Sequence, residues 1–146
     1  MKAKQFMIES YKGAMPIRFG MNHDDVEKAL VEPKIKSSNF FKHMAYNYDL
    51  LSVGFDKDSF VHHIGFLPGA DVSYEGEPLF LHDTFSHLVR LDSRAKEVVG
   101  FVVLLELGIA FAGFHDGDDS QKSVSIFRKG NYDELLGKME DFKIRG

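Results

Sequence analysis

Apolar and polar residues alternate along two neighbouring stretches near the middle of the chain. One face of the first stretch contains Leu51, Val53 and Phe55, and one face of the second contains Phe60, His62, Ile64 and Phe66. Residues 56–59, which read DKDS, provide turn-forming side chains between them. Because such alternation is typical of half-buried strands, we predict an antiparallel hairpin over residues 51–66 with these side chains toward the core.

The most apolar stretch, residues 98–114, resembles a membrane span only in its length. It reads VVGFVVLLELGIAFAGF, with Glu106 in the middle and glycines that interrupt it. The charged residue and the many Val and Phe residues are typical of buried strands, so we predict two strands that meet near residues 106–108. Further strands are predicted over SVSIFR, residues 123–128, and over ADVSYEG, residues 70–76.

A short helix is predicted after Asn22, whose side chain suits the N-cap position. Asp24 and Asp25 follow in the first turn, where the helix dipole favours negative charge. Met21 and Val26 have the spacing of a hydrophobic staple, and a proline at position 33 ends the helix. Helix initiation thus explains these residues without a catalytic or metal-binding role.

Two further helices are predicted later in the chain. One runs from Thr84 to about Leu91, with Asp83 or Thr84 as its cap. Its buried stripe consists of Phe85, Leu88 and Val89. The other follows Asn131 as its cap, with Glu134 at the capping-box position.

The order of these elements is helix, hairpin, helix, strands and helix. Neighbouring strands joined by tight turns form antiparallel sheets, and the helices need a sheet face on which to bury their apolar stripes. A length of 146 residues suits one domain with its own core. We therefore predict an α+β fold, an antiparallel β-sheet packed by a few short α-helices, in a single domain over residues 1–146.

The charge balance and the lack of cysteine exclude several classes of function. Acidic residues outnumber basic ones by 22 to 18, which argues against general nucleic-acid binding and is compatible with a basic protein partner. Without cysteine, disulfides, thiolate catalysis and cysteine-ligated zinc are excluded. The basic start MKAKQFMIES has no long apolar run behind it, so we expect no signal peptide, no membrane association and a cytoplasmic location.

Seven histidines raise the question of a metal site. His62 and His63 are neighbours on a predicted strand and are expected to point to opposite faces. His82 and His87 are five residues apart, whereas one helical face needs three or four. The loop HDGDD, residues 115–119, lacks the distal glutamate of a calcium loop. We expect no metal and no cofactor, and the sequence has neither a G-x-S-x-G motif nor a phosphate-binding glycine loop.

Aromatic residues gather beside polar ones in FFKHMAYNYD, residues 40–49. The surrounding residues 34–48 fit either a short helix capped by Ser38 or Asn39 or an ordered loop. Tyrosine is a common interface anchor, and acidic side chains speed the encounter with a basic partner. The predicted protein interface consists of Tyr46, Tyr48, Asp49, Asp116, Asp118 and Asp119. The alternative is that the rings only close the base of the sheet.

The stretch GMNHDDVEKAL, followed by YDLLSVGFDKDSFVHHIGF, resembles the module of small outer-membrane lipoproteins of the SmpA/OmlA (BamE) family. β-Lactamase-inhibitor proteins have a similar architecture, and related patterns occur in small bacterial proteins with immunity roles. The resemblance covers roughly residues 17–67, and the chain departs from it because it lacks both the lipoprotein cysteine and the inhibitors' disulfides. It implies a protein-binding scaffold and transfers no catalytic residue.

Two hypotheses of function follow. The first is a non-enzymatic protein-binding module, of the kind of an immunity or inhibitor protein that neutralises a toxin domain. The second is a small enzyme or ligand-binding protein with a His/Asp site around His62, His82 and His115. A concave pocket with convergent polar groups would favour the second hypothesis, whereas an interface can be flat or convex.

Overall fold

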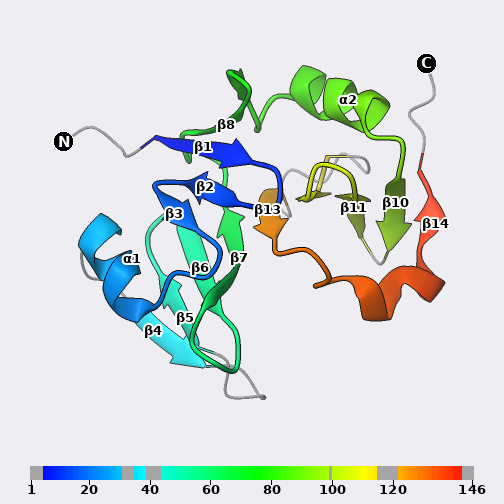
Figure 1. Cartoon of the computed structure of the whole chain (residues 1–146). Coiled ribbons are helices and arrows are strands. Elements are labelled where there is room, and N and C mark those ends of the chain that lie inside the picture. The colour runs from blue at the N-terminus through cyan, green and yellow to red at the C-terminus, as the bar shows by residue number, and fades with distance from the viewer. Residues whose placement is uncertain (1–4, 31–34, 39–43, 99, 115–121, 143–146) are drawn as a thin grey trace.

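The computed structural model describes residues 5–30, 35–38, 44–98, 100–114 and 122–142. In these residues the chain forms two β-sheets, two α-helices and a 3-10 helix (Figure 1). All strand pairs are antiparallel except β1 with β8. The fold is therefore broadly α+β, with strands as the dominant element.

The two sheets differ in size. The smaller sheet has the order β3-β2-β1-β8-β9, and the larger has the order β14-β10-β11-β12-β13-β7-β6-β5-β4. The strands of the smaller sheet are β1 (Phe6–Glu9), β2 (Gly13–Met15), β3 (Ile17–Arg18), β8 (Val72–Tyr74) and β9 (Glu77–Pro78). The strands of the larger sheet are β4 (Ile35–Ser38), β5 (Met44–Asn47), β6 (Leu51–Phe55), β7 (Val61–Phe66), β10 (Ala95–Val98), β11 (Phe101–Leu104), β12 (Ile109–Ala112), β13 (Ser123–Phe127) and β14 (Glu140–Asp141).

One apolar core joins the two sheets and both helices. Helix α1 (His23–Leu30) buries Val26 and Leu30 in it. Helix α2 (His82–Leu91) buries the predicted stripe, which consists of Phe85, Leu88 and Val89. Its Phe85 ring meets the Phe111 ring of β12 at 5.0 Å between centres, so α2 packs on the larger sheet.

The strands predicted from apolar runs are confirmed. Strands β11 and β12 divide the run at residues 98–114, and a turn over residues 105–108 joins them. SVSIFR contains β13, and ADVSYEG contains β8. No helix in the described residues is long and apolar enough to cross a membrane.

Several strands were not predicted. Residues 35–38 and 44–47 form β4 and β5, an antiparallel pair, so the expectation of a helix or loop over residues 34–48 is wrong for them. All four residues of β4 are exposed at the edge of the sheet, so no apolar alternation marks this strand. Strands β1, β2 and β3 near the N-terminus, and β10 after α2, were missed as well.

The cap of α1 forms as predicted. The Asn22 side-chain oxygen accepts the Asp25 N–H at 2.9 Å, and the Asp25 carboxylate accepts the Asn22 N–H at 3.3 Å. Met21 is partly buried against the core that contains Val26. Pro33, the predicted end of the helix, lies outside the described residues.

We expect Asn22→Ala to lower the free energy of unfolding by about 1 kcal/mol, because the Asp25 N–H loses its side-chain acceptor. Urea denaturation followed by circular dichroism measures the change. Asn22→Ser keeps a capping oxygen and should retain most of the stability. An alanine variant as stable as the wild type would refute the cap.

The caps of the other two helices differ from the prediction. Helix α2 begins at His82, with Leu81 at its N-cap and no side-chain cap, so Asp83 or Thr84 as the cap is wrong. Both residues lie inside the helix: Asp83 is in the first turn, where the dipole favours its charge, and Thr84 is buried.

The last predicted helix is a 3-10 helix over Asp133–Lys138, with Tyr132 at its N-cap and no side-chain cap. Asn131 as the cap is wrong, because its side-chain amide donates to the His62 carbonyl instead. The side chain of Glu134, the predicted capping-box residue, lies outside the described part of the structure.

Candidate functional site

Four neighbouring strands of the larger sheet, β5, β6, β7 and β13, have one face of large apolar side chains and one of mostly small or polar ones, with Phe127 at the end of β13 as the large exception. The core face carries Tyr46, Val53, Ile64, Phe66, Val124 and Ile126. The opposite face carries Ala45, Asn47, Ser52, Gly54, His63, Gly65, Ser123 and Ser125. Because the strands are adjacent, the small side chains leave a continuous depression over the sheet.

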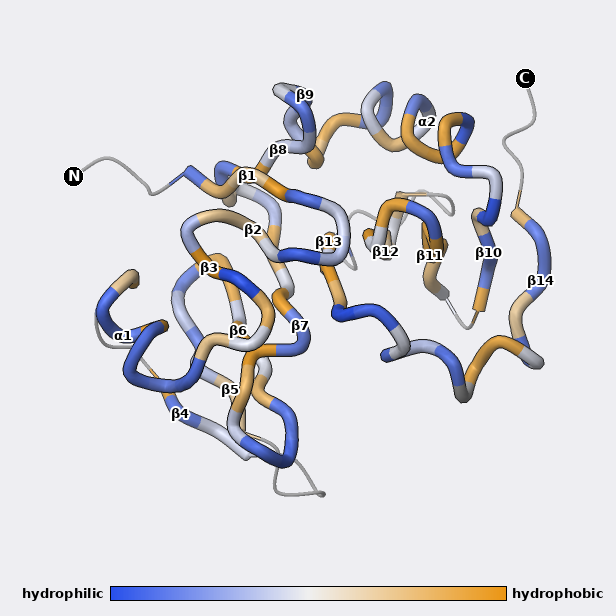
Figure 2. The backbone as a smooth tube through the Cα atoms, viewed as in Figure 1, coloured by the Kyte–Doolittle hydropathy of each residue, from blue (hydrophilic) through white to orange (hydrophobic). Residues whose placement is uncertain are grey.

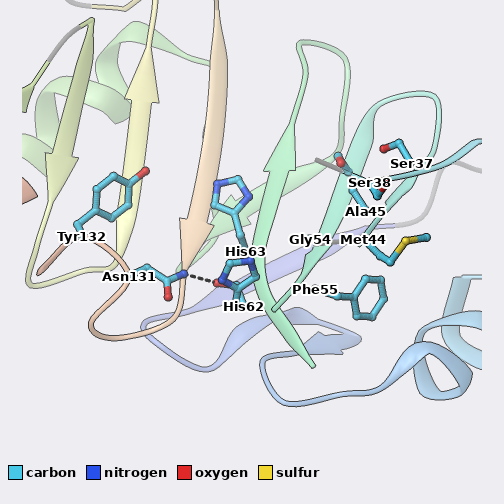
Figure 3. Close-up of a pocket in the computed structure, with 11 residues that line it drawn as sticks. Ser37, Ser38, Met44, Ala45, Gly54, Phe55, His62, His63, Asn131 and Tyr132 are labelled. Atoms are coloured by element: carbon cyan, nitrogen blue, oxygen red, sulfur yellow. Dashed lines mark hydrogen bonds between the residues drawn. The ribbon is translucent and has the colours of Figure 1, made fainter. Parts of the chain in front are cut away.

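Two hollows make up this depression, which we call the sheet-face groove. The first has a volume of about 490 Å³ and the second about 400 Å³, and they share Ser52, His63 and Tyr132. Figure 3 shows the first hollow, with His63 between Ser37 of β4 and Tyr132 of the C-terminal segment. Both volumes lie in the range of ordinary ligand pockets.

A β-bulge in β7 brings two histidines to the groove. Gly54 pairs with His63, but the next residue, Phe55, pairs with Val61, so His62 is an extra residue in β7. His62 and His63 both line the first hollow, with ring centres 6.5 Å apart. The expectation that they point to opposite faces is therefore wrong, because the extra residue breaks the alternation.

The same bulge changes which side chains of the hairpin are buried. Ile64 and Phe66 are buried as predicted, and His62 is partly buried. Phe60, predicted in the core, is 43% exposed, and Val61 is fully buried in its place. Because the bulge adds one residue, the residues before His62 point to the face opposite to the one that regular alternation predicts.

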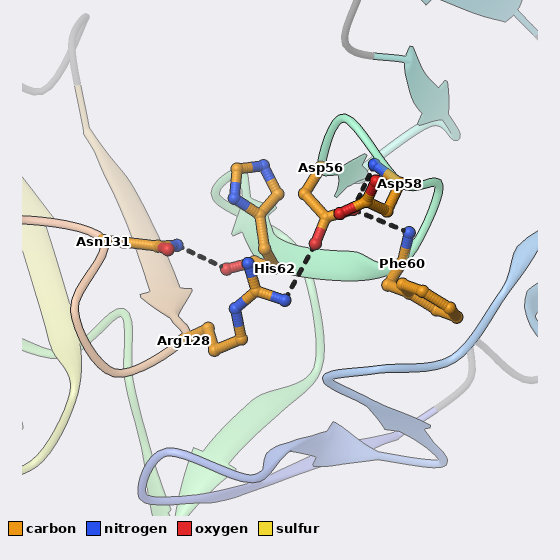
Figure 4. Close-up of polar contacts among 6 residues, drawn as sticks. All are labelled: Asp56, Asp58, Phe60, His62, Arg128 and Asn131. Atoms are coloured by element: carbon orange, nitrogen blue, oxygen red, sulfur yellow. Dashed lines mark hydrogen bonds and ion pairs between the residues drawn. The ribbon is translucent and has the colours of Figure 1, made fainter.

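The segment after β13 holds the bulge in place. The His62 carbonyl accepts the Arg128 backbone N–H at 2.9 Å. It also accepts the Asn131 side-chain amide at 2.7 Å, as Figure 4 shows. The Arg128 guanidinium also pairs with the Asp56 carboxylate at 2.9 Å. Gly130, with a φ of 94°, supplies the backbone turn that leads to Tyr132. Figure 2 shows this turn as a hydrophilic stretch directly after the hydrophobic end of β13.

Tyr132 forms a fixed wall of the groove. Its ring packs edge-on against Phe127, with 4.5 Å between centres. Burial raises the pKa of its hydroxyl, and a side-chain hydrogen bond with Ser125 opposes that rise in part. The ring is thus fastened to β13 at two points, beside both hollows.

The Asp56 carboxylate is ionised well into the acid range. Burial acts to raise its pKa, but the Phe60 N–H, the Arg128 guanidinium and the Asp58 N–H together hold the pKa below the ordinary value of 3.8. A carboxyl group whose pKa is lower in the folded than in the unfolded protein stabilises the fold at pH values above its unfolded-state pKa. That stabilisation is lost as the pH falls through the folded pKa.

We therefore expect Asp56→Asn to destabilise the fold near neutral pH, with a difference from wild type that shrinks in acid. Urea midpoints of both proteins from about pH 7 to about pH 3 measure this difference. Asp58→Asn, a change of an exposed neighbour, is the control and should track the wild type. A difference that stays constant over the whole range would refute the role of the Asp56 charge.

A short ladder of hydrogen bonds crosses three strands of the groove. The Ser52 hydroxyl donates to the Asn47 side-chain oxygen at 2.9 Å. The Asn47 amide donates to the Ser37 hydroxyl oxygen at 2.9 Å and to the Ile35 carbonyl at 3.2 Å. The direction of these bonds leaves the Ser37 hydroxyl hydrogen and a Ser52 lone pair for a bound group.

The described residues that line the groove include no side chain with a permanent charge. Among the described residues that line its two hollows there is no Asp, Glu, Lys or Arg. Burial, with a smaller effect of the neighbouring His62, lowers the pKa of His63 to about 4. Burial, followed by the effects of Tyr46 and Glu27, raises the pKa of Tyr48 to about 12. The His63 ring makes no hydrogen bond to a described residue, so both of its nitrogens are available to a ligand.

The second hollow opens beside large apolar side chains that are exposed. Leu67 is 49% and Phe101 40% exposed, and both line this hollow together with Tyr48 and Leu51. The groove thus has a polar half around the ladder and an apolar half around Leu67 and Phe101.

The predicted interface residues are only partly brought together. Tyr46 is 3% exposed, and its hydroxyl contacts His23 Nδ1 at 2.8 Å, so its prediction as a surface anchor is wrong. It faces the core because it alternates with the groove residues of β5. Tyr48 lines the second hollow, and Asp49 is exposed beside it in the sequence. The remaining three, Asp116, Asp118 and Asp119, lie outside the described residues.

The alternative histidine site is not assembled in the described residues. His62 lines the first hollow, whereas His82 lies on α2, where its Nδ1 is 3.5 Å from the Ser86 hydroxyl. His82 lines neither hollow of the groove, and His115 lies outside the described residues. No three His, Asp or Glu side chains in the described part of the chain gather as they would to hold a metal ion.

Most groove residues were not selected from the sequence. Ser52, Gly54, Gly65, Ser125 and Tyr132 were missed. The strands do contain a pattern for them, because SVGF, HIGF and SVSIF each alternate a small or polar residue with a large apolar one. Such alternation indicates a sheet face without bulk, but not which strands lie side by side.

Comparison of the chain with protein-family models, with curated proteins and with solved structures gives no match.

Proposed function

We propose that this chain is a non-enzymatic protein-binding module that receives its partner in the sheet-face groove. The observation that carries the proposal is a concave surface whose described lining residues include no Asp, Glu, Lys or Arg, with exposed Leu67 and Phe101 at one end. The centres of protein interfaces are likewise depleted of charged residues and enriched in aromatic ones. The proposal includes an immunity or inhibitor role, the relation to BamE-like proteins and a cytoplasmic location.

One acidic residue beside the apolar half of the groove would attract a basic group of a partner. Asp49 is exposed next to Tyr48, which lines the apolar half. An acidic side chain at the rim of an interface speeds the encounter with a basic partner, whereas buried rings at its centre slow dissociation. The net charge of -4 acts in the same direction.

Photo-crosslinking in the source cell tests this proposal. A photoreactive phenylalanine analogue replaces Leu67, Phe101 or Leu91 in separate proteins. Leu91 is the matched control, since it is 52% exposed but lies on α2. We expect one and the same protein to be captured from Leu67 and Phe101 and not from Leu91. Capture of the same protein from all three positions, or of none from the first two, would refute the proposal.

The second candidate is an enzyme or small-ligand binder that uses the first hollow. Two observations favour it: the first hollow is concave with several polar side chains around it, and His62 and His63 both line it with ring centres 6.5 Å apart. Imidazoles are common general acids and bases, although the lowered pKa of His63 favours its neutral form. A turnover reaction of the isolated protein that is lost in both His62→Ala and His63→Ala would support this candidate against the first.

A further inference from the structure

We infer that the sheet-face groove binds an extended, uncharged peptide segment of the partner, laid across β4, β5, β6, β7 and β13. This inference rests on the proposed function and names the chemistry of the part that binds. It is carried by the floor of the groove, by its hydrogen-bonding groups and by its lack of charge.

The floor of the groove is open down to the backbone. Gly54 and Gly65 have no side chains, and a Cβ added to either would be no closer than 3.5 Å to the nearest neighbouring atom. On Gly65 the nearest atom would be Cε1 of His63, at 3.7 Å. The two glycines therefore leave empty space beside the His63 ring, although a side chain would fit there. A bound peptide can enter this space.

The groups beside this floor match the backbone of a peptide. The Ser37 hydroxyl hydrogen suits a peptide carbonyl, and the free lone pair on the Ser52 oxygen suits a peptide N–H. The neutral His63 ring adds one donor and one acceptor, and the described residues satisfy neither. Neutral groups of both kinds at fixed positions suit amides, each of which has one donor and one acceptor.

The lack of charge selects against ionic side chains. A Lys, Arg, Asp or Glu that enters the groove would lose water and find no counter-ion among the described lining residues. An apolar side chain next to the polar stretch gains instead, because Leu67, Phe101 and Tyr48 line the adjoining hollow. Leu51 and Leu67 in this half suit the apolar side chain of a peptide, whereas a neutral oligosaccharide has only hydroxyl groups and the C–H faces of its rings, which stack on aromatic side chains.

A displayed library of random linear peptides, selected on the wild-type protein and depleted on Gly65→Val, tests the inference. Valine suits a strand, Gly65 has no positive φ, and the added methyl groups occupy the groove. We expect enriched peptides to share a core without charged residues, with apolar positions beside Ser, Thr, Asn or Gln. Synthetic copies should bind Gly65→Val on the order of tenfold more weakly than wild type. Gly137→Ala, in open space on the 3-10 helix, should bind like the wild type.

Three outcomes would overturn the inference. They are an enriched core with a shared charged residue, no peptide that depends on the groove, or groove-dependent binding of neutral oligosaccharides on a glycan array instead. If Gly65→Val fails to fold by circular dichroism, Ser52→Val fills the same surface from β6. If crosslinking from Leu67 and Phe101 finds a partner but the library yields no peptide, the proposed protein-binding function is supported and the inference of a bound extended peptide is refuted. If both experiments fail, the proposed function falls as well.

Discussion

Replacement of Asp92 by alanine is expected to lower the free energy of unfolding by about 3 kcal/mol. Asp92 is 5% exposed, and its carboxylate accepts three backbone N–H groups. They are those of Arg94 at 2.8 Å, Glu106 at 2.9 Å and Leu107 at 2.9 Å. These bonds fasten the residues before β10 to the turn between β11 and β12. Alanine would leave three N–H donors without their acceptor in a partly buried place.

Urea denaturation of Asp92→Ala and of a matched control measures this effect. Asp71→Ala removes an exposed carboxylate and should change stability by no more than about 0.5 kcal/mol. Asp92→Asn keeps one acceptor oxygen and should lie between the alanine variant and the wild type. If Asp92→Ala is no less stable than Asp71→Ala, the carboxylate does not hold the turn.

The second large effect is expected for Phe85→Ala, at about 4 kcal/mol of lost stability. The Phe85 ring is buried and lies 5.0 Å from the Phe111 ring and 5.4 Å from the Phe114 ring, centre to centre. It is the side chain through which α2 packs on β12, so its removal leaves a cavity lined by rings that cannot all close over it.

Thermal and urea denaturation of Phe85→Ala measure this loss. Leu91→Ala, on the same helix but at an exposed position, should lose no more than about 0.5 kcal/mol. Phe85→Ala and Leu91→Ala change the helix propensity by nearly the same small amount, so the difference between their free energies of unfolding reports the burial of Phe85. A difference below about 1 kcal/mol would show that α2 is not packed on the sheet as described.

Periodicity was sufficient to predict the central strands, but not the faces of β7. Ile64 and Phe66 obey the alternation, whereas Phe60 is exposed because His62 is an extra residue. The bulge is held by Arg128 and Asn131, which are distant in sequence. Nothing in the local stretch DSFVHHIGF distinguishes a bulged strand from a regular one, so the error came from a contact that the local sequence does not contain.

The edge strand and the groove were not predictable for a related reason. All residues of β4 are exposed, so only pairing with β5 makes the segment a strand. The groove needs β13 beside β7, with Ser125 opposite Gly65, and that pairing joins strands that are separated in sequence by five other strands and α2. By contrast, Asn22 and Asp25 were predictable, because a helix cap depends on residues three positions apart.

The most direct measurement is the affinity of the crosslinked partner, once purified, for the wild type, Phe101→Ser and Leu91→Ser. Both substitutions remove an exposed apolar side chain, but only Phe101 lines the groove. Binding through the sheet-face groove predicts that Phe101→Ser weakens the complex by about tenfold or more, mainly through faster dissociation. It also predicts that Leu91→Ser binds like the wild type. Equal affinities for all three proteins, or a larger loss for Leu91→Ser, would contradict it.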